Sequence, residues 1–151
     1  MLRQFLVGAA ASGCNIAIHA LVMVTVIKVA RLADELATAY QTVRLIAIMI
    51  AAVTVLMIAH LAEVLVWTLT YAAVGVAPEG TDLMYFAFVN YTTLGYGDVT
   101  PVKRWHLLGP MTAMNGVLLF GWSTAVIFEV LRTTLLAGGE EGDRKKRGWP
   151  K

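Results

Sequence analysis

The stretch Thr-Thr-Leu-Gly-Tyr-Gly-Asp at residues 92–98 decides how the rest of the chain is interpreted. An aromatic and apolar segment at residues 82–91 precedes it, and this segment is too short to cross a membrane. Thr81 or Asp82 can cap the start of a helix there. We therefore predict a short helix over residues 82–91, followed by irregular backbone that carries the glycine-containing stretch.

Three long apolar blocks surround this region. Residues 4–27 and 105–128 hold no Asp, Glu, Lys or Arg, and residues 45–78 hold only Glu63. The hydrophobic share of 58% and the mean hydropathy of +0.70 agree with this pattern. Since a membrane span needs about 20 apolar residues, the blocks predict membrane-spanning helices, over residues 6–30, 45–76 and 105–136.

Basic residues gather after the first and the last apolar block: Lys28, Arg31, Arg44, Arg132, Arg144, Lys145, Lys146 and Arg147. The positive-inside rule places both groups in the cytoplasm, so we predict an external N-terminus and a cytoplasmic C-terminus. Residues 31–44 are expected to form a short cytoplasmic helix, or a helical elbow, on the membrane surface, and residues 138–151 a basic cytoplasmic tail without regular structure. The tail is interpreted as a topology anchor, and no nucleic-acid partner is expected.

The chemistry of residues 92–98 suits a dehydrated cation. Irregular backbone at membrane depth survives only where it is buried in protein or lines water. Consecutive carbonyls can replace the hydration shell of K⁺ if they face one axis, which requires unusual dihedrals at alternate residues. Gly95 and Gly97 can adopt a positive φ at little cost, and the Thr93 hydroxyl offers another oxygen. Because one chain provides one wall, several chains must surround the axis.

These residues resemble the signature of the potassium-channel superfamily, whose filter consists of four such loops. The resemblance covers residues 72–136. It implies an all-α membrane protein with the potassium-channel pore fold, in which two transmembrane helices flank a pore helix and a selectivity filter. Here one extra N-terminal helix is added. The expected division is residues 1–44 for that helix and its elbow, 45–137 for the pore domain and 138–151 for the tail.

The resemblance implies a homotetramer in membrane lipid that conducts K⁺ passively and selectively. The expected location is the cell membrane, the inner membrane of a bacterium, with several passes. K⁺ is the permeant ion, held by the carbonyls of Thr93, Leu94, Gly95 and Tyr96, with Gly97 completing the filter. Leu94 replaces the commoner valine. No other cofactor is expected, and an unidentified gating partner is left open.

The resemblance also suggests residues that support the filter. Tyr85 and Phe86 match an aromatic pair on the pore helix. Val89 stands where some bacterial relatives carry a glutamate that bonds the filter aspartate, Asp98. We therefore predict a hydrogen bond from the Tyr85 hydroxyl to Asp98. Two glycines of the last helix are candidates for a gating hinge or for close packing alone: Gly116 and Gly121.

Polar residues within the apolar blocks add further candidates. His60 and Glu63 lie three apart, so they share a helix face, and an unpaired charge there is expensive. We predict that both support the filter and face the last helix or pore-helix groups such as Asn90, with regulation by protonation as the alternative. Two residues are a weak signal for a metal site. His19 is interpreted as a neutral, hydrogen-bonded residue.

Two questions stay open at this point. Glu129 lies one turn before Arg132, which predicts a local ion pair; the alternative is a ring of four carboxylates at the inner mouth. The function itself has a rival: a non-conducting sensor or adaptor module that retains the pore architecture. No catalytic constellation is visible, so an enzyme is not expected.

Overall fold

The computed structural model describes residues 1–35 and 41–146, with side chains for residues 1–30 and 42–135. The described chain is helical and contains no strand, which confirms the predicted all-α fold class. Its elements are α1 (Leu2–Glu35), α2 (Gln41–Val74), α3 (Leu83–Tyr91), the short 3₁₀ turn η1 (Lys103–Trp105) and α4 (Leu108–Lys146).

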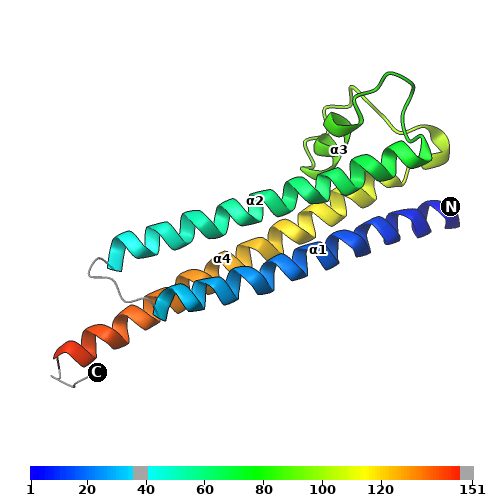
Figure 1. The fold of residues 1–151 in the computed structure, drawn as a ribbon. Helices are drawn as coiled ribbons and strands as arrows, with labels where there is room; N and C mark the ends of the chain where they lie inside the picture. Colours follow the sequence, from blue (N-terminus) through cyan, green and yellow to red (C-terminus); the bar gives the residue numbers. More distant parts are fainter. Residues whose placement is uncertain (36–40, 147–151) are drawn as a thin grey trace.

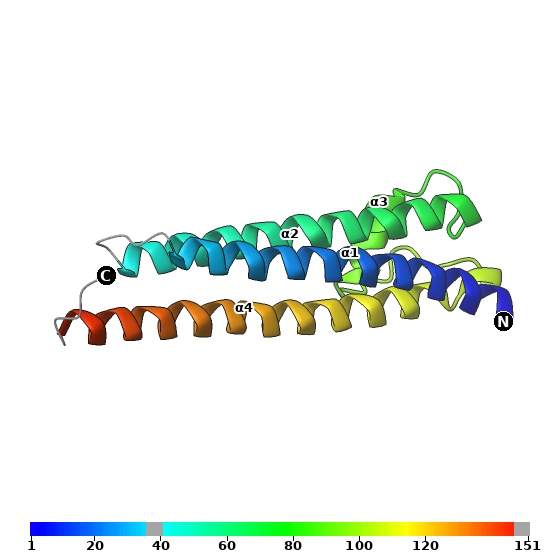
Figure 2. The ribbon, with the colours of Figure 1, turned by 60° about the horizontal axis from the view of Figure 1, so that its bottom comes forward.

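The three long helices run side by side, and α3 lies with its loops at one end of the bundle (Figures 1 and 2). The N-terminus is at this same end, here called the α3 end, and the C-terminus is at the opposite, far end. Three stretches are long and apolar enough to cross a membrane: Leu2–Ala30 in α1, Thr42–Val74 in α2, and Lys103–Leu135, which covers η1 and most of α4. This is the architecture of a multi-pass membrane protein.

Two boundaries differ from the predictions. The first helix was expected to end near residue 30, whereas α1 continues to Glu35 and includes the start of the helical elbow; residues 36–40 of that elbow lie outside the described residues. The prediction that the tail lacks regular structure is wrong as far as Lys146, because α4 continues to that residue. Extending an existing helix adds one hydrogen bond per residue without a new nucleation cost. Residues 147–151 lie outside the described part.

Large aromatic side chains fill the core at the α3 end. Trp67, Tyr71 and Phe86 are almost fully buried, and the ring centroids of Tyr71 and Phe86 lie 5.3 Å apart. The core also holds Tyr91 and Trp105. Aromatic side chains bury more area than other residues, so this cluster fixes α3 firmly between α2 and α4.

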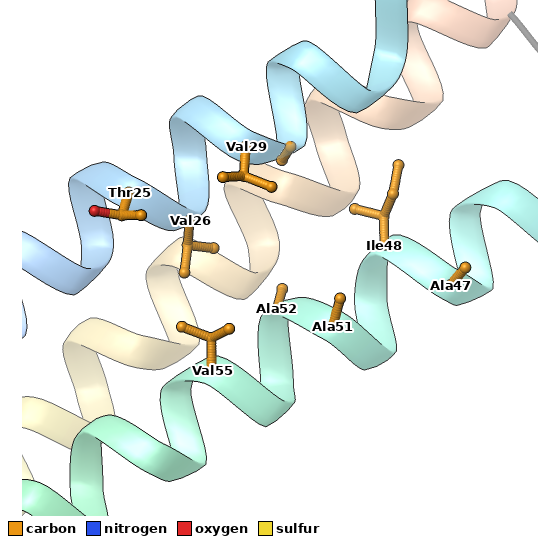
Figure 3. Close-up of a pocket in the computed structure, with 9 residues that line it drawn as sticks. Thr25, Val26, Val29, Ala47, Ile48, Ala51, Ala52 and Val55 are labelled. Atoms are coloured by element: carbon orange, nitrogen blue, oxygen red, sulfur yellow. The ribbon is translucent and has the colours of Figure 1, made fainter. Parts of the chain in front are cut away.

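The far end of the bundle is packed more loosely. Small and branched apolar residues meet there, and α1 and α2 leave a hollow of about 310 Å³ between them. Figure 3 shows side chains from both helices around it, among them Val26, Val29, Ala47, Ala51, Ala52 and Val55. The alanine side chains are too short to fill the space between the two helices.

Candidate functional site

The short helix α3 leads directly into residues 92–98. The Asp82 carboxylate caps its start, accepting hydrogen bonds of 3.0 Å from the backbone N–H groups of Met84 and Tyr85. At its other end the Val89 carbonyl accepts hydrogen bonds from Leu94 at 3.0 Å and from Gly95 at 3.4 Å. The backbone after α3 therefore folds back onto the end of the helix and holds the first half of the stretch in place.

Alternate residues of the stretch have a positive φ. The values are 60° at Thr93, 59° at Gly95 and 79° at Gly97. The expectation for the two glycines is confirmed. Thr93 was missed by sequence reasoning, because a β-branched residue rarely adopts this conformation, which costs roughly 1–2 kcal/mol for an L-residue.

The carbonyl groups of residues 93–96 are free to bind a ligand. Among the described residues, none of these four oxygens accepts a backbone or side-chain hydrogen bond. The Thr93 hydroxyl donates to the Thr92 carbonyl at 2.6 Å, so its own lone pairs also stay available. Buried backbone carbonyls are normally paired within a protein, whereas residues 92–98 are exposed in the single chain. Their carbonyls are therefore open to water or to a cation.

The side chains of the stretch are uncovered in the single chain. Tyr96 is 67% exposed and Leu94 is 53% exposed. Tyr96 therefore does not brace the stretch against helices of its own chain. One chain forms one side of a site and leaves the other sides open, as the sequence argument requires.

The Asp98 carboxylate is the main reason why the pKa of the Tyr85 hydroxyl is raised above 10.0, since it favours the protonated phenol. This effect agrees with the predicted pairing of the two side chains, and the hydrogen bond itself stays a prediction. Tyr85 remains partly exposed, whereas its neighbour Phe86 is buried in the aromatic core. The two members of the predicted aromatic pair thus point to different surroundings.

The two glycines of α4 have different environments. A Cβ atom at Gly116 would lie 2.0 Å from the Tyr91 carbonyl oxygen, whereas a Cβ at Gly121 would meet nothing within 4 Å. Gly116 is thus needed for the close approach of α3 to α4. Both lie within the continuous helix α4, and their role as hinges stays a prediction.

Glu129 forms the local ion pair that the sequence predicts. Its Oε2 lies 3.6 Å from Nη1 of Arg132, one turn further along α4. Both side chains are exposed, at 38% for Glu129 and 62% for Arg132. An exposed pair of this kind contributes about 0–1 kcal/mol. The ring of carboxylates remains a separate prediction.

A buried polar cluster joins α2, α3 and α4. As expected, His60 and Glu63 turn toward α3 and α4: Nδ1 of His60 lies 2.9 Å from Glu63 Oε2, and its Nε2 lies 3.0 Å from Ser123 Oγ. The α3 partner is Tyr91, whose hydroxyl donates to Glu63. Asn90, the partner named from the sequence, bonds Tyr71 instead, at 3.3 Å.

The N-terminal helix joins this cluster, which sequence reasoning missed. Nδ1 of His19 lies 2.6 Å from Glu63 Oε1, and both side chains are fully buried. Asn15 donates to the Asn115 side chain at 2.9 Å and to the Glu63 carbonyl at 3.2 Å. A polar residue in a membrane helix is expected to find a partner, but the partners are 44 to 100 residues away.

One comparison with known proteins gives a match. The family model described as an ion channel matches residues 59–133, which include most of the second half of α2, all of α3, the 92–98 stretch and α4 up to residue 133. The match supports an ion channel function for this part of a membrane protein and does not include α1. No curated protein and no solved structure matches the chain.

Proposed function

We propose that the chain is one subunit of a homotetrameric channel that conducts K⁺ selectively and passively across the cell membrane. Residues 92–98 are the selectivity filter, and the carbonyls of Thr93, Leu94, Gly95 and Tyr96 bind the ion. The observation that carries this proposal is the alternation of positive φ along a row of carbonyls without hydrogen-bond partners. The coarser function, an ion channel, has the support of the family match.

The placement of α3 adds an electrostatic argument. The helix ends at Tyr91, directly before the filter. The carboxyl end of a helix carries partial negative charge, equivalent to roughly half an elementary charge. This end attracts a cation close to the proposed filter, and four copies around an axis would add their fields.

Flux into liposomes is the direct test. Purified full-length protein, reconstituted alone, is expected to pass K⁺ and to exclude Na⁺. Gly95→Ala should abolish or degrade the selective flux, because Gly95 has a φ of 59° that an L-residue adopts only with strain. Gly80→Ala is the matched control: Gly80 has a φ of 82° in the loop before α3, with open space around it, so its flux should stay selective.

The outcomes separate the rival functions. Flux that does not distinguish Na⁺ from K⁺ contradicts selectivity, and no flux in intact, folded protein favours the non-conducting sensor or adaptor. Native mass spectrometry of the reconstituted protein tests the tetramer, for which we expect four copies. A stable monomer or dimer in the same flux-competent preparation would contradict the four-fold axis.

A further inference from the structure

Two histidines and one carboxylate meet inside the bundle. His19 comes from α1, and His60 and Glu63 come from α2. One possible ligand atom from each lies within 4.8 Å of the others. The His19 and Glu63 side chains are fully buried, and that of His60 is 12% exposed. Thus a single chain brings three metal-binding groups to one point.

The atoms that converge are suitable ligands. Both histidines direct Nδ1 at the same carboxylate, at 2.6 Å for His19 and 2.9 Å for His60. The Tyr91 hydroxyl contacts this carboxylate as well and lies 2.9 Å from Nδ1 of His60. Two imidazole nitrogens, a carboxylate and a phenol oxygen together offer four ligands.

Ser123 provides the outer contact that metal-bound histidines usually make. Its Oγ lies 3.0 Å from Nε2 of His60 and 3.3 Å from Nε2 of His19. A hydroxyl oxygen has two lone pairs, so it can accept an N–H from both rings. In that tautomer Nδ1 of each ring turns a free lone pair toward Glu63, an arrangement that suits a cation bound between them.

We propose that His19, His60 and Glu63 bind Zn²⁺, with the Tyr91 oxygen as the fourth ligand. Nitrogen and oxygen ligands in four-fold coordination suit Zn²⁺, whereas K⁺, Mg²⁺ and Ca²⁺ sites use oxygen alone. The carboxylate balances one positive charge of the ion.

A bound ion at this site would connect three elements. It would join α1 through His19, α2 through His60 and Glu63, and α3 through Tyr91, the residue directly before Thr92. Of these ligands, His19 lies outside the residues that the ion channel family model matches. The site therefore gives the additional helix α1 a role in holding the start of the filter, whether or not the filter is selective for K⁺.

Binding is tested on the purified full-length protein without a histidine tag, after treatment with a chelator. Calorimetric titration with Zn²⁺ is expected to give one ion per chain, and Co²⁺ should produce the visible absorption of a four-coordinate site. His19→Gln and Glu63→Gln should each weaken binding about 100-fold or more, and Ser123→Ala about 10- to 100-fold, the usual effect of losing an outer contact. His106→Gln is the control, because His106 is exposed and outside the cluster.

A second measurement guards against variants that fold poorly. Zn²⁺ should raise the melting temperature of the wild type and of His106→Gln, because an ion that binds only the folded state stabilises it, and should leave that of His19→Gln unchanged. The proposal is overturned if the wild type shows no stoichiometric Zn²⁺ binding and no melting shift, or if binding survives both ligand substitutions. Neither readout depends on ion flux, so this result is independent of the proposed conduction.

Discussion

Thr93 combines a branched side chain with a left-handed backbone, which most proteins avoid. Its φ of 60° stands in register with those of Gly95 and Gly97. The strain is held locally, since the Thr93 N–H donates to the Asn90 carbonyl at 3.0 Å and the next two N–H groups donate to Val89. These three bonds explain why a conformation that costs free energy persists at this residue.

Tyr85 gives a prediction at the same scale. Tyr85→Phe removes the hydroxyl that is predicted to bond Asp98, so we expect the K⁺ flux of the variant to decay faster than that of the wild type. The pKa of Tyr85 is raised above 10.0, so the phenol keeps its proton and its bond at every pH below that value. The difference between the two proteins should be constant from about pH 7 to 9 and should vanish as the pH rises through the raised pKa.

Asp98→Asn and the double variant complete the test. If the two side chains act through one bond, the double variant should decay no faster than the more affected single variant. Additive effects, or a Tyr85→Phe variant that matches the wild type between pH 7 and 9, would mean that this bond does not brace the filter.

At the scale of the element, Gly116 and Gly121 of α4 predict opposite outcomes. Gly116→Ala forces a Cβ to 2.0 Å from the Tyr91 carbonyl, so α3 and α4 must separate, at a cost of about 1–3 kcal/mol. Gly121→Ala meets open space and should stabilise the helix by roughly 0.5–1 kcal/mol. Thermal denaturation in detergent measures both changes.

Flux measured on the same two variants addresses the hinge. A Gly121→Ala variant that is stable but conducts less than the wild type supports bending at residue 121. Unchanged flux in that variant excludes a hinge there, and equal stability of both variants would contradict the packing role of Gly116.

The elements also mark where sequence reasoning succeeds and where it stops. Hydropathy and residue type are local properties of the sequence. The three long helices, α3 and the positive φ of Gly95 and Gly97 were therefore predictable from short windows. The pairing of His19 with Glu63 depends on how α1 is rotated and shifted against α2, and no local pattern contains that register. The positive φ of Thr93 goes with the hydrogen bonds that fold residues 93–95 back onto the end of α3, and not with the preference of a β-branched residue.

At the scale of the whole molecule, the distribution of charge along the bundle predicts a response to salt. Glu129 is already paired with Arg132, so its field is partly cancelled. We expect Glu129→Gln to change the outward current by the same factor at low and at high ionic strength, measured in planar bilayers. A larger loss at low salt, where charges act over longer distances, would instead support a ring of four carboxylates.

Arg132→Gln is the matched variant, because it frees the carboxylate without removing it. If the pair cancels the field of Glu129, the variant should carry more outward current than the wild type at low salt and the same current at high salt, because the unmasked carboxylates attract K⁺. A current that matches the wild type at both salt concentrations would mean that Arg132 does not mask Glu129.

The hollow between α1 and α2 makes the bundle mechanically uneven. Near α3 the two helices are joined by the polar contacts of Asn15 and His19 with Glu63. Separating the helices there would leave buried polar groups without hydrogen-bond partners. Around Val26 and Ala52 the surfaces that face each other across the gap are almost entirely hydrocarbon, and lipid tails offer equivalent contacts. We therefore expect α1 and α2 to separate more easily at the far end of the bundle than near α3.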